Sequence, residues 1–175
     1  MTRPYHHIYL TGYRGSGKTS VGKLLSQILS LPVIDLDDHI EAAAGMSIRE
    51  IFETESEAGF RDRESQSLRI VAAQSPSIVS LGGGAILREE NRRLITSTGF
   101  CVWLKVDVDT VIERLQLDAI TAERRPALTT LPQRDEIASM LATREPIYAS
   151  VSQVAISVTG KQLHDIANEV IAAMH

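Results

Sequence analysis

The chain has 175 residues, of which 43% are hydrophobic and 23% charged. This composition fits one folded domain and excludes disordered, collagen-like and coiled-coil proteins. The formal net charge of −4 argues against a general nucleic-acid or membrane-surface binder, and the single cysteine, Cys101, excludes an internal disulfide or a multi-cysteine zinc site. The sequence contains neither a signal-peptide core nor an apolar run long enough to cross a bilayer, so it predicts a cytoplasmic protein.

Short apolar runs alternate with helical patterns along the chain, which predicts β-α units around a parallel sheet with helices on both faces. The predicted strands are residues 7–10, 33–35, 78–81, 100–106 and 154–158. The predicted helices are residues 18–30, 38–44, 48–54, 57–73, 89–98, 110–117, 133–150 and 162–173. The polar segment from about 116 to 131 fits neither pattern and contains Arg124, Arg125 and Pro126. A segment of this kind inside a compact domain predicts a lid.

A phosphate-binding loop follows the first predicted strand. Residues 12–19, GYRGSGKT, match G-x-x-x-x-G-K-[ST] at every fixed position and lead into a predicted helix, which is the context that makes the pattern specific. The glycines let backbone N–H groups and the helix N-terminus approach phosphate oxygens. Lys18 can reach the β- and γ-phosphates, and the Thr19 hydroxyl can ligate Mg²⁺. The loop predicts a nucleotide site.

Two acids follow the second predicted strand, Asp35 and Asp37. If this segment is extended, both side chains point to the same side. Asp35 is then available for a magnesium-bound water, and Asp37 for accepting a proton or a hydroxyl hydrogen bond. The spacing supports a second interpretation equally well, in which Asp37 and Asp38 cap the next helix.

The remaining candidates are a glycine cluster and three arginines. Gly82, Gly83 and Gly84 follow the third predicted strand, at the edge of a parallel sheet where ligands bind, although they also suit a loose turn. Arg61 and Arg144 lie in predicted helices, where solvent-exposed ion pairs are the commoner role. Arg125, in the predicted lid, is better placed to meet a transferring phosphate.

Together these segments resemble the shikimate kinase family over nearly the whole chain. The resemblance rests on residues 12–22, Asp35 and Asp37, residues 45–52, Glu57, Phe60 and Arg61, Glu64, residues 82–85, Arg125 and Pro126, and Arg144 and Tyr148. Many nucleotide-binding proteins share the first segment, whereas the combination is far more selective. Ser56 departs from the family, which usually has glycine there, and the segment from 114 to 125 is longer than usual.

The resemblance implies a three-layer P-loop NTPase fold of the NMP-kinase type. It implies one domain over residues 1–175, with a five-stranded parallel sheet in the order 2-3-1-4-5, a shikimate-binding region at about 35–64 and a lid at about 116–131. The implied reaction converts ATP and shikimate to ADP and shikimate 3-phosphate, with Mg²⁺, in aromatic amino-acid biosynthesis. The implied protein is a monomer with no nucleic-acid or membrane partner.

The resemblance also implies roles for individual residues. The catalytic residues are Lys18, Asp37 and Arg125. Nucleotide contacts fall on Gly15, Ser16, Gly17, Lys18, Thr19, Ser20, Arg114, Arg125 and Lys161. Shikimate contacts fall on Asp37, Arg61, Gly82, Gly83, Gly84 and Arg144, and the magnesium ligands are Thr19 and Asp35. The alternatives are a related small-molecule kinase, such as a gluconate kinase, or a nucleotide-binding module without catalysis.

Overall fold

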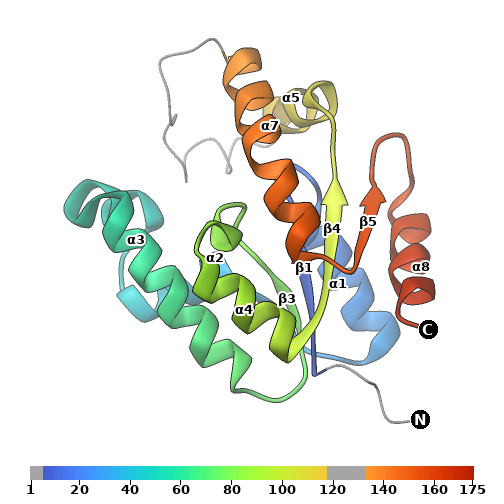
Figure 1. Cartoon of the computed structure of the whole chain (residues 1–175), viewed down its shortest axis with the longest axis horizontal. Helices are drawn as coiled ribbons and strands as arrows, with labels where there is room; N and C mark the ends of the chain where they lie inside the picture. Colours follow the sequence, from blue (N-terminus) through green and yellow to red (C-terminus); the bar gives the residue numbers. More distant parts are fainter. Residues whose placement is uncertain (1–5, 118–132) are drawn as a thin grey trace.

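A computed structural model describes residues 6–117 and 133–175 of the chain. Within these residues, five strands form one parallel sheet in the order β2-β3-β1-β4-β5 (Figure 1). The strands are β1 (His7–Thr11), β2 (Val33–Asp35), β3 (Ile78–Ser80), β4 (Gly99–Lys105) and β5 (Val154–Ser157). The order 2-3-1-4-5 is confirmed. The central strand, β1, is buried along its whole length, as expected for a parallel sheet covered on both faces.

Helices cover both faces of the sheet, as predicted. They are α1 (Lys18–Leu29), α2 (Leu36–Ala44), α3 (Ile48–Ala72), the 3₁₀ turn η1 (Ala85–Leu87), α4 (Glu89–Thr98), α5 (Val108–Leu117), α7 (Gln133–Val151) and α8 (Leu163–Ala173). One buried cluster joins the sheet to α1, α5 and α8, and a second joins it to α2, α3, α4 and the end of α7 (Figure 1). No helix in the described part of the chain is long and apolar enough to span a bilayer.

Helix α2 starts earlier than the sequence predicted, and with a different cap. Asp35 is its N-cap, and the Asp35 carboxylate accepts a hydrogen bond from the backbone N–H of Asp37. The alternative in which Asp37 and Asp38 cap this helix is therefore wrong. The assumption of an extended segment is also wrong, because the strand ends at Asp35 and Asp37 already lies in the first helical turn.

Helix α3 joins two segments that the sequence predicted as separate helices. It starts with a capping box in which Ser47 accepts from the Glu50 N–H and Glu50 accepts from the Ser47 N–H. The backbone is non-helical at one residue, Ser56, with φ 64° and ψ −179°. The predicted break between residues 54 and 57 is therefore present as a kink, because one residue interrupts the helical conformation without ending the element.

Candidate active site

Three loops come together where β1, β3 and β2 end. The phosphate loop (residues 12–19) follows β1, the acids Asp35 and Asp37 follow β2, and the glycine turn (residues 82–84) follows β3. These three strands are direct neighbours and all run the same way. Their carboxyl ends therefore place a nucleotide loop, two acids and a glycine turn side by side, which is where α/β sheets bind ligands.

The phosphate loop has the backbone shape that anion binding needs. Gly15 and Gly17 have φ of 78° and 89°, a conformation that glycine adopts readily. Gly17 is the N-cap of α1, and the first turn of that helix contains no acidic residue, so the helix N-terminus suits an anionic ligand. Lys18 donates from Nζ to the Gly12 and Tyr13 carbonyls at 2.8 and 3.0 Å. These bonds fold its ammonium back over the loop.

A pocket of about 390 Å³ opens beside this loop. It is lined by Gly15, Ser16, Gly17, Ser20, Val21, Arg114, Leu115, Lys161, Leu163 and Ile166. Arg114 donates from Nη1 to the Gly15 carbonyl at 2.9 Å, and the Lys161 ammonium pairs with Glu169 at 2.6 Å. The structure thus brings the distant residues Arg114 and Lys161 to the phosphate loop, in a pocket with an apolar side that suits a nucleoside.

Two oxygen ligands suited to magnesium lie together at the mouth of the loop. The Thr19 hydroxyl donates to Asp35 Oδ2 at 3.0 Å, and the other carboxylate oxygen of Asp35 accepts from the Asp37 N–H at 3.0 Å. Burial, and then the neighbouring charge of Asp37, raise the pKa of Asp35 above its usual range. A hydroxyl and a carboxylate side by side match the oxygen preference of Mg²⁺, which completes its shell with phosphates and water.

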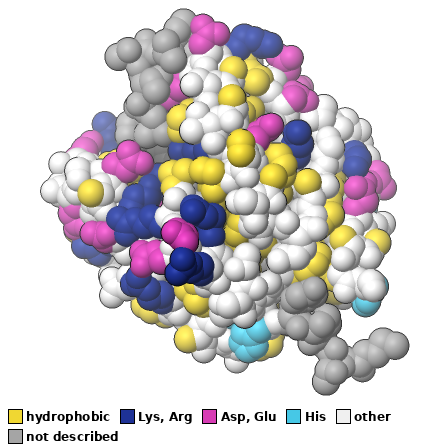
Figure 2. All heavy atoms as spheres, viewed as in Figure 1, with side chains coloured by type: hydrophobic (Ala, Val, Ile, Leu, Met, Phe, Trp, Pro, Cys, Tyr) yellow, Lys and Arg dark blue, Asp and Glu magenta, His cyan; other side chains and the backbone are white. Residues whose placement is uncertain are grey.

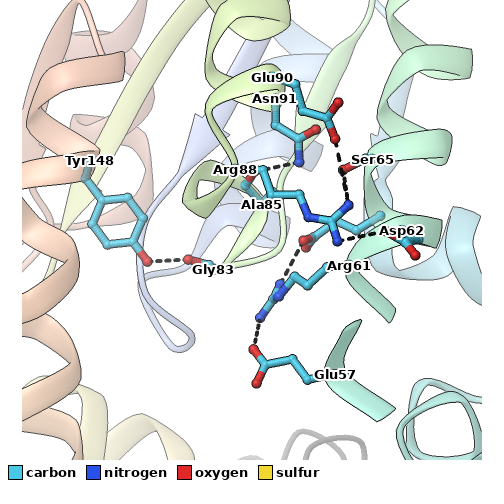
Figure 3. Close-up of polar contacts among 11 residues, drawn as sticks. Glu57, Arg61, Asp62, Ser65, Gly83, Ala85, Arg88, Glu90, Asn91 and Tyr148 are labelled. Carbon is cyan, nitrogen blue, oxygen red and sulfur yellow. Dashed lines mark hydrogen bonds and ion pairs between the residues drawn. The ribbon is translucent and has the colours of Figure 1, made fainter. Parts of the chain in front are cut away.

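Arg61 lies on α3, facing the glycine turn. Its guanidinium pairs with Glu64 at 2.7 Å and with Glu57 at 3.3 Å (Figure 3 shows the Glu57 pair). The side chain of Arg61 is 12% exposed and that of Glu64 only 1%, so this is not the solvated ion pair that is common on helices. A Cβ added at Gly84 would lie 2.6 Å from Cζ of Arg61. A side chain at position 84 would displace this guanidinium, which lies directly against the backbone of the turn.

Arg144 approaches the same turn from α7. It is 6% exposed, and its Cζ lies 6.0 Å from the centre of the Tyr13 ring. A Cβ added at Gly83 would be 3.6 Å from Nη1 of Arg144 and 3.6 Å from the Tyr148 hydroxyl. In the parts of the chain that the structure describes, no carboxylate forms an ion pair with Arg144. A buried cation in that position favours an anionic ligand.

Tyr148 is a site residue that the sequence analysis left without a role. It is fully buried, and its hydroxyl donates to the Gly83 carbonyl at 2.6 Å (Figure 3). The signal in the sequence was its spacing, since Tyr148 lies one helical turn after Arg144 and both residues therefore face the same side of α7.

Ion pairs fasten α3 to α4 beside the glycine turn. Figure 2 shows Lys and Arg side chains gathered over these helices, with Asp and Glu side chains among them. Arg88 pairs with Asp62 at 2.7 Å, and Arg69 pairs with Glu90 at 2.8 Å. The arginines of this surface are thus paired with acids of the neighbouring helix.

Arg124, Arg125 and the predicted lid, except its first two residues at the end of α5, fall outside the described residues. Their assigned roles stay predictions. The other residues named from the sequence lie around one edge of the sheet, on the loops and helices given above.

Comparisons with known proteins identify the relatives of this chain. The shikimate kinase family model matches residues 14–175. A shikimate kinase of Rhodopirellula baltica is 48% identical over 167 residues, which cover 95% of this chain and 89% of the relative. A shikimate kinase from Acinetobacter baumannii, solved in complex with shikimate, has a TM-score of 0.88 and 31% identity, covering 97% of this chain and 92% of that one.

A gluconokinase from Sinorhizobium meliloti is also similar in structure, with a TM-score of 0.60 and 21% identity over 99% of this chain and 93% of that one. At that identity the likeness shows a shared fold alone, so it does not support the gluconate kinase alternative. The family model and the curated relative both cover far more than half of the chain. The chain belongs to the shikimate kinase family.

Proposed function

We propose that this chain transfers the γ-phosphoryl group of ATP to a ring hydroxyl of shikimate, giving ADP and shikimate 3-phosphate, with Arg61 and Arg144 binding the acceptor carboxylate. The observation that carries the assignment of the acceptor is Arg144. It is a buried guanidinium without a carboxylate partner in the described residues, and it lies at the glycine turn opposite Arg61. Two guanidiniums around one small acid give the bidentate, oriented contact that positions a hydroxyl for reaction.

The donor side supplies electrostatic stabilisation. The N–H groups of the phosphate loop and Lys18 bind the β- and γ-phosphates, and the pocket with Arg114 and Lys161 receives the nucleoside. Thr19 and Asp35 are the proposed ligands of Mg²⁺. With Mg²⁺ held there, the site would gain positive charge that offsets the negative charge of the transferring group. Arg125 is proposed to meet the same group.

Asp37 is the proposed base. It lies in the first turn of α2, two residues after Asp35, and is half-buried next to that proposed metal ligand. As the shikimate oxygen bonds to the γ-phosphorus, the bond from phosphorus to ADP breaks and Asp37 accepts the hydroxyl proton. The phosphoryl group thus passes from ATP to the shikimate oxygen, and the hydroxyl proton passes to Asp37.

An acceptor panel tests the proposal. ADP release is measured with ATP and Mg²⁺ in the presence of shikimate, gluconate or no acceptor, and the product is identified by phosphorus NMR. We expect turnover with shikimate only. Equal or faster release with gluconate would establish the related-kinase alternative, and no acceptor-dependent release would establish the non-catalytic one.

We also propose that the enzyme acts as a monomer, as the resemblance to the shikimate kinase family implies. Sedimentation at assay concentrations should then give the 19.2 kDa mass of one chain. A dimer at those concentrations would contradict this.

A further inference from the structure

Tyr148 connects the two halves of the acceptor site. Its ring is fully buried and stacks on Trp103 of β4, with centroids 5.8 Å apart and planes 28° apart. Its hydroxyl donates to the Gly83 carbonyl at 2.6 Å. The ring packing leaves the hydroxyl little freedom, so the hydrogen bond ties the glycine turn to the helix that carries Arg144.

The hydrogen bond from Tyr148 orients the whole peptide group between Gly83 and Gly84. The Gly83 carbonyl and the Gly84 N–H belong to the same planar peptide group, so a fixed carbonyl also fixes the neighbouring N–H and the position of Gly84. Arg144 lies against Gly83, and Arg61 lies against Gly84. One rigid peptide group, held by Tyr148, therefore lies between the two arginines.

The other end of the turn is held independently. Asn91, on α4, donates to the Ala85 carbonyl at 2.9 Å, and Arg92 donates to the Ile86 and Leu87 carbonyls at 2.8 Å (Figure 3 shows the Asn91 bond). These bonds fix η1. Within the turn, the Gly82 and Gly84 carbonyls accept from the Ala85 and Leu87 N–H groups at 3.0 Å, whereas the Gly83 carbonyl accepts from Tyr148. Tyr148 supplies the attachment on the α7 side.

We propose that Tyr148 is a positioning residue for the acceptor. It sets the spacing of Arg61 and Arg144 through the Gly83–Gly84 peptide, without contacting shikimate itself. This inference rests on the proposed function, because it assigns the two arginines to the acceptor carboxylate.

The test is Tyr148→Phe, which keeps the ring and its packing on Trp103 and removes only the hydroxyl. We expect KM for shikimate to rise about tenfold, the usual effect of losing one buried hydrogen bond. KM for ATP should change by less than about twofold, because the phosphate loop is held by its own bonds. The amide of Gly84 should exchange with solvent several times faster in the ligand-free variant, as measured by NMR.

Tyr9→Phe is the matched control. Tyr9 is also fully buried, and its hydroxyl forms one hydrogen bond, to Thr98 at 2.7 Å, away from the site. Both variants should lose thermal stability, since each loses a buried hydrogen bond. Only Tyr148→Phe should change KM for shikimate and the exchange of Gly84.

The inference is overturned if Tyr148→Phe leaves both KM for shikimate and Gly84 exchange unchanged. It is also overturned if Tyr9→Phe shifts KM for shikimate equally, or if KM for ATP rises in parallel, because either result means general loosening. A wild-type protein without shikimate-dependent turnover refutes the proposed function instead. The exchange of Gly84 then decides alone whether Tyr148 holds the turn.

Discussion

The phosphate loop and the glycine turn lie at the same edge of the sheet, but their charged groups are held in different ways. Lys18 is bound by carbonyls five and six residues before it, within one short segment. The glycine turn depends on Tyr148, which is 65 residues away from Gly83, and on Arg61 from another helix. Lys18 is thus held locally, although Arg114 also reaches the phosphate loop from 99 residues away, whereas the acceptor side is assembled by the fold.

This difference has a kinetic consequence. A change in the phosphate loop should act directly on the chemical step, because its groups meet the charge that develops on the transferring phosphoryl. A change in the contacts around the glycine turn should act mainly on acceptor affinity, because those contacts set the position of the carboxylate ligands. Substitutions on each side of the site test this division between turnover and acceptor affinity.

The largest effect is expected for Asp37→Asn. The amide has the same shape but cannot accept the hydroxyl proton, so turnover with shikimate should fall by about a thousandfold. Nucleotide affinity, measured by calorimetry, should stay close to that of the wild type. Asp38→Asn, at the next and exposed position of the same helical turn, is the control and should retain turnover. If nucleotide affinity collapsed while shikimate still bound normally, Asp37 would belong to the metal site instead.

Lys18→Ala should lower kcat by at least about a hundredfold, on the order of 3 kcal/mol of transition-state stabilisation. The loop N–H groups remain, but the ammonium that reaches the phosphates is gone. The matched control is Lys23→Ala, an exposed lysine on the same helix, which should leave kcat unchanged. Activity of Lys18→Ala within a few-fold of wild type would refute the assignment of the phosphate loop.

Arg61→Ala and Arg144→Ala should each raise KM for shikimate by about ten- to a hundredfold, the range for one charged contact. Their stabilities should differ. Arg61→Ala removes the cation beside the buried carboxylate of Glu64, so its Tm should fall. Arg144→Ala removes a buried charge that has no ion pair in the described residues, so its Tm should stay or rise. Steady-state kinetics and thermal unfolding of both variants check this, and a change in kcat alone would contradict the acceptor role.

The phosphate loop could be predicted from the sequence because its parts are contiguous. The residues 12–19 carry both the motif and its context, a strand before and a helix after, and the structure places them as predicted. The strand order is a different case. Periodicity predicted a parallel sheet, but it carries no information on which strands are neighbours, and the order came from the resemblance to the family.

The acceptor side could be predicted only in part from the sequence. From the sequence alone, Arg61 and Arg144 could each be a solvent-exposed ion-pair residue or a binding residue. The choice between these roles depends on burial, which the fold determines. The extended segment expected at Asp35 and Asp37 is absent for a local reason, because the Asp35 carboxylate caps α2 and the strand ends before Asp37. The sequence indicates no role for Tyr148, because its partner, the Gly83 carbonyl, is a backbone atom far away in the chain. Contacts of this kind leave no local pattern.

The smallest effect concerns strain beside the acceptor site. Ser56, with φ 64° and ψ −179°, occupies a region of backbone space that is nearly exclusive to glycine. Ser56→Gly should therefore raise the free energy of unfolding by about 1 kcal/mol and Tm by about 2–4 °C. Ser30→Gly is the comparison: Ser30 caps α1 at φ 52° and ψ 42°, a left-handed conformation that costs serine less, so its gain should be smaller.

Because Glu64 still holds Arg61 next to Gly84, KM for shikimate should stay the same in Ser56→Gly. A lower Tm would show that the kink stores no strain, and a changed KM would show that acceptor affinity depends on the kink as well as on the glycine turn.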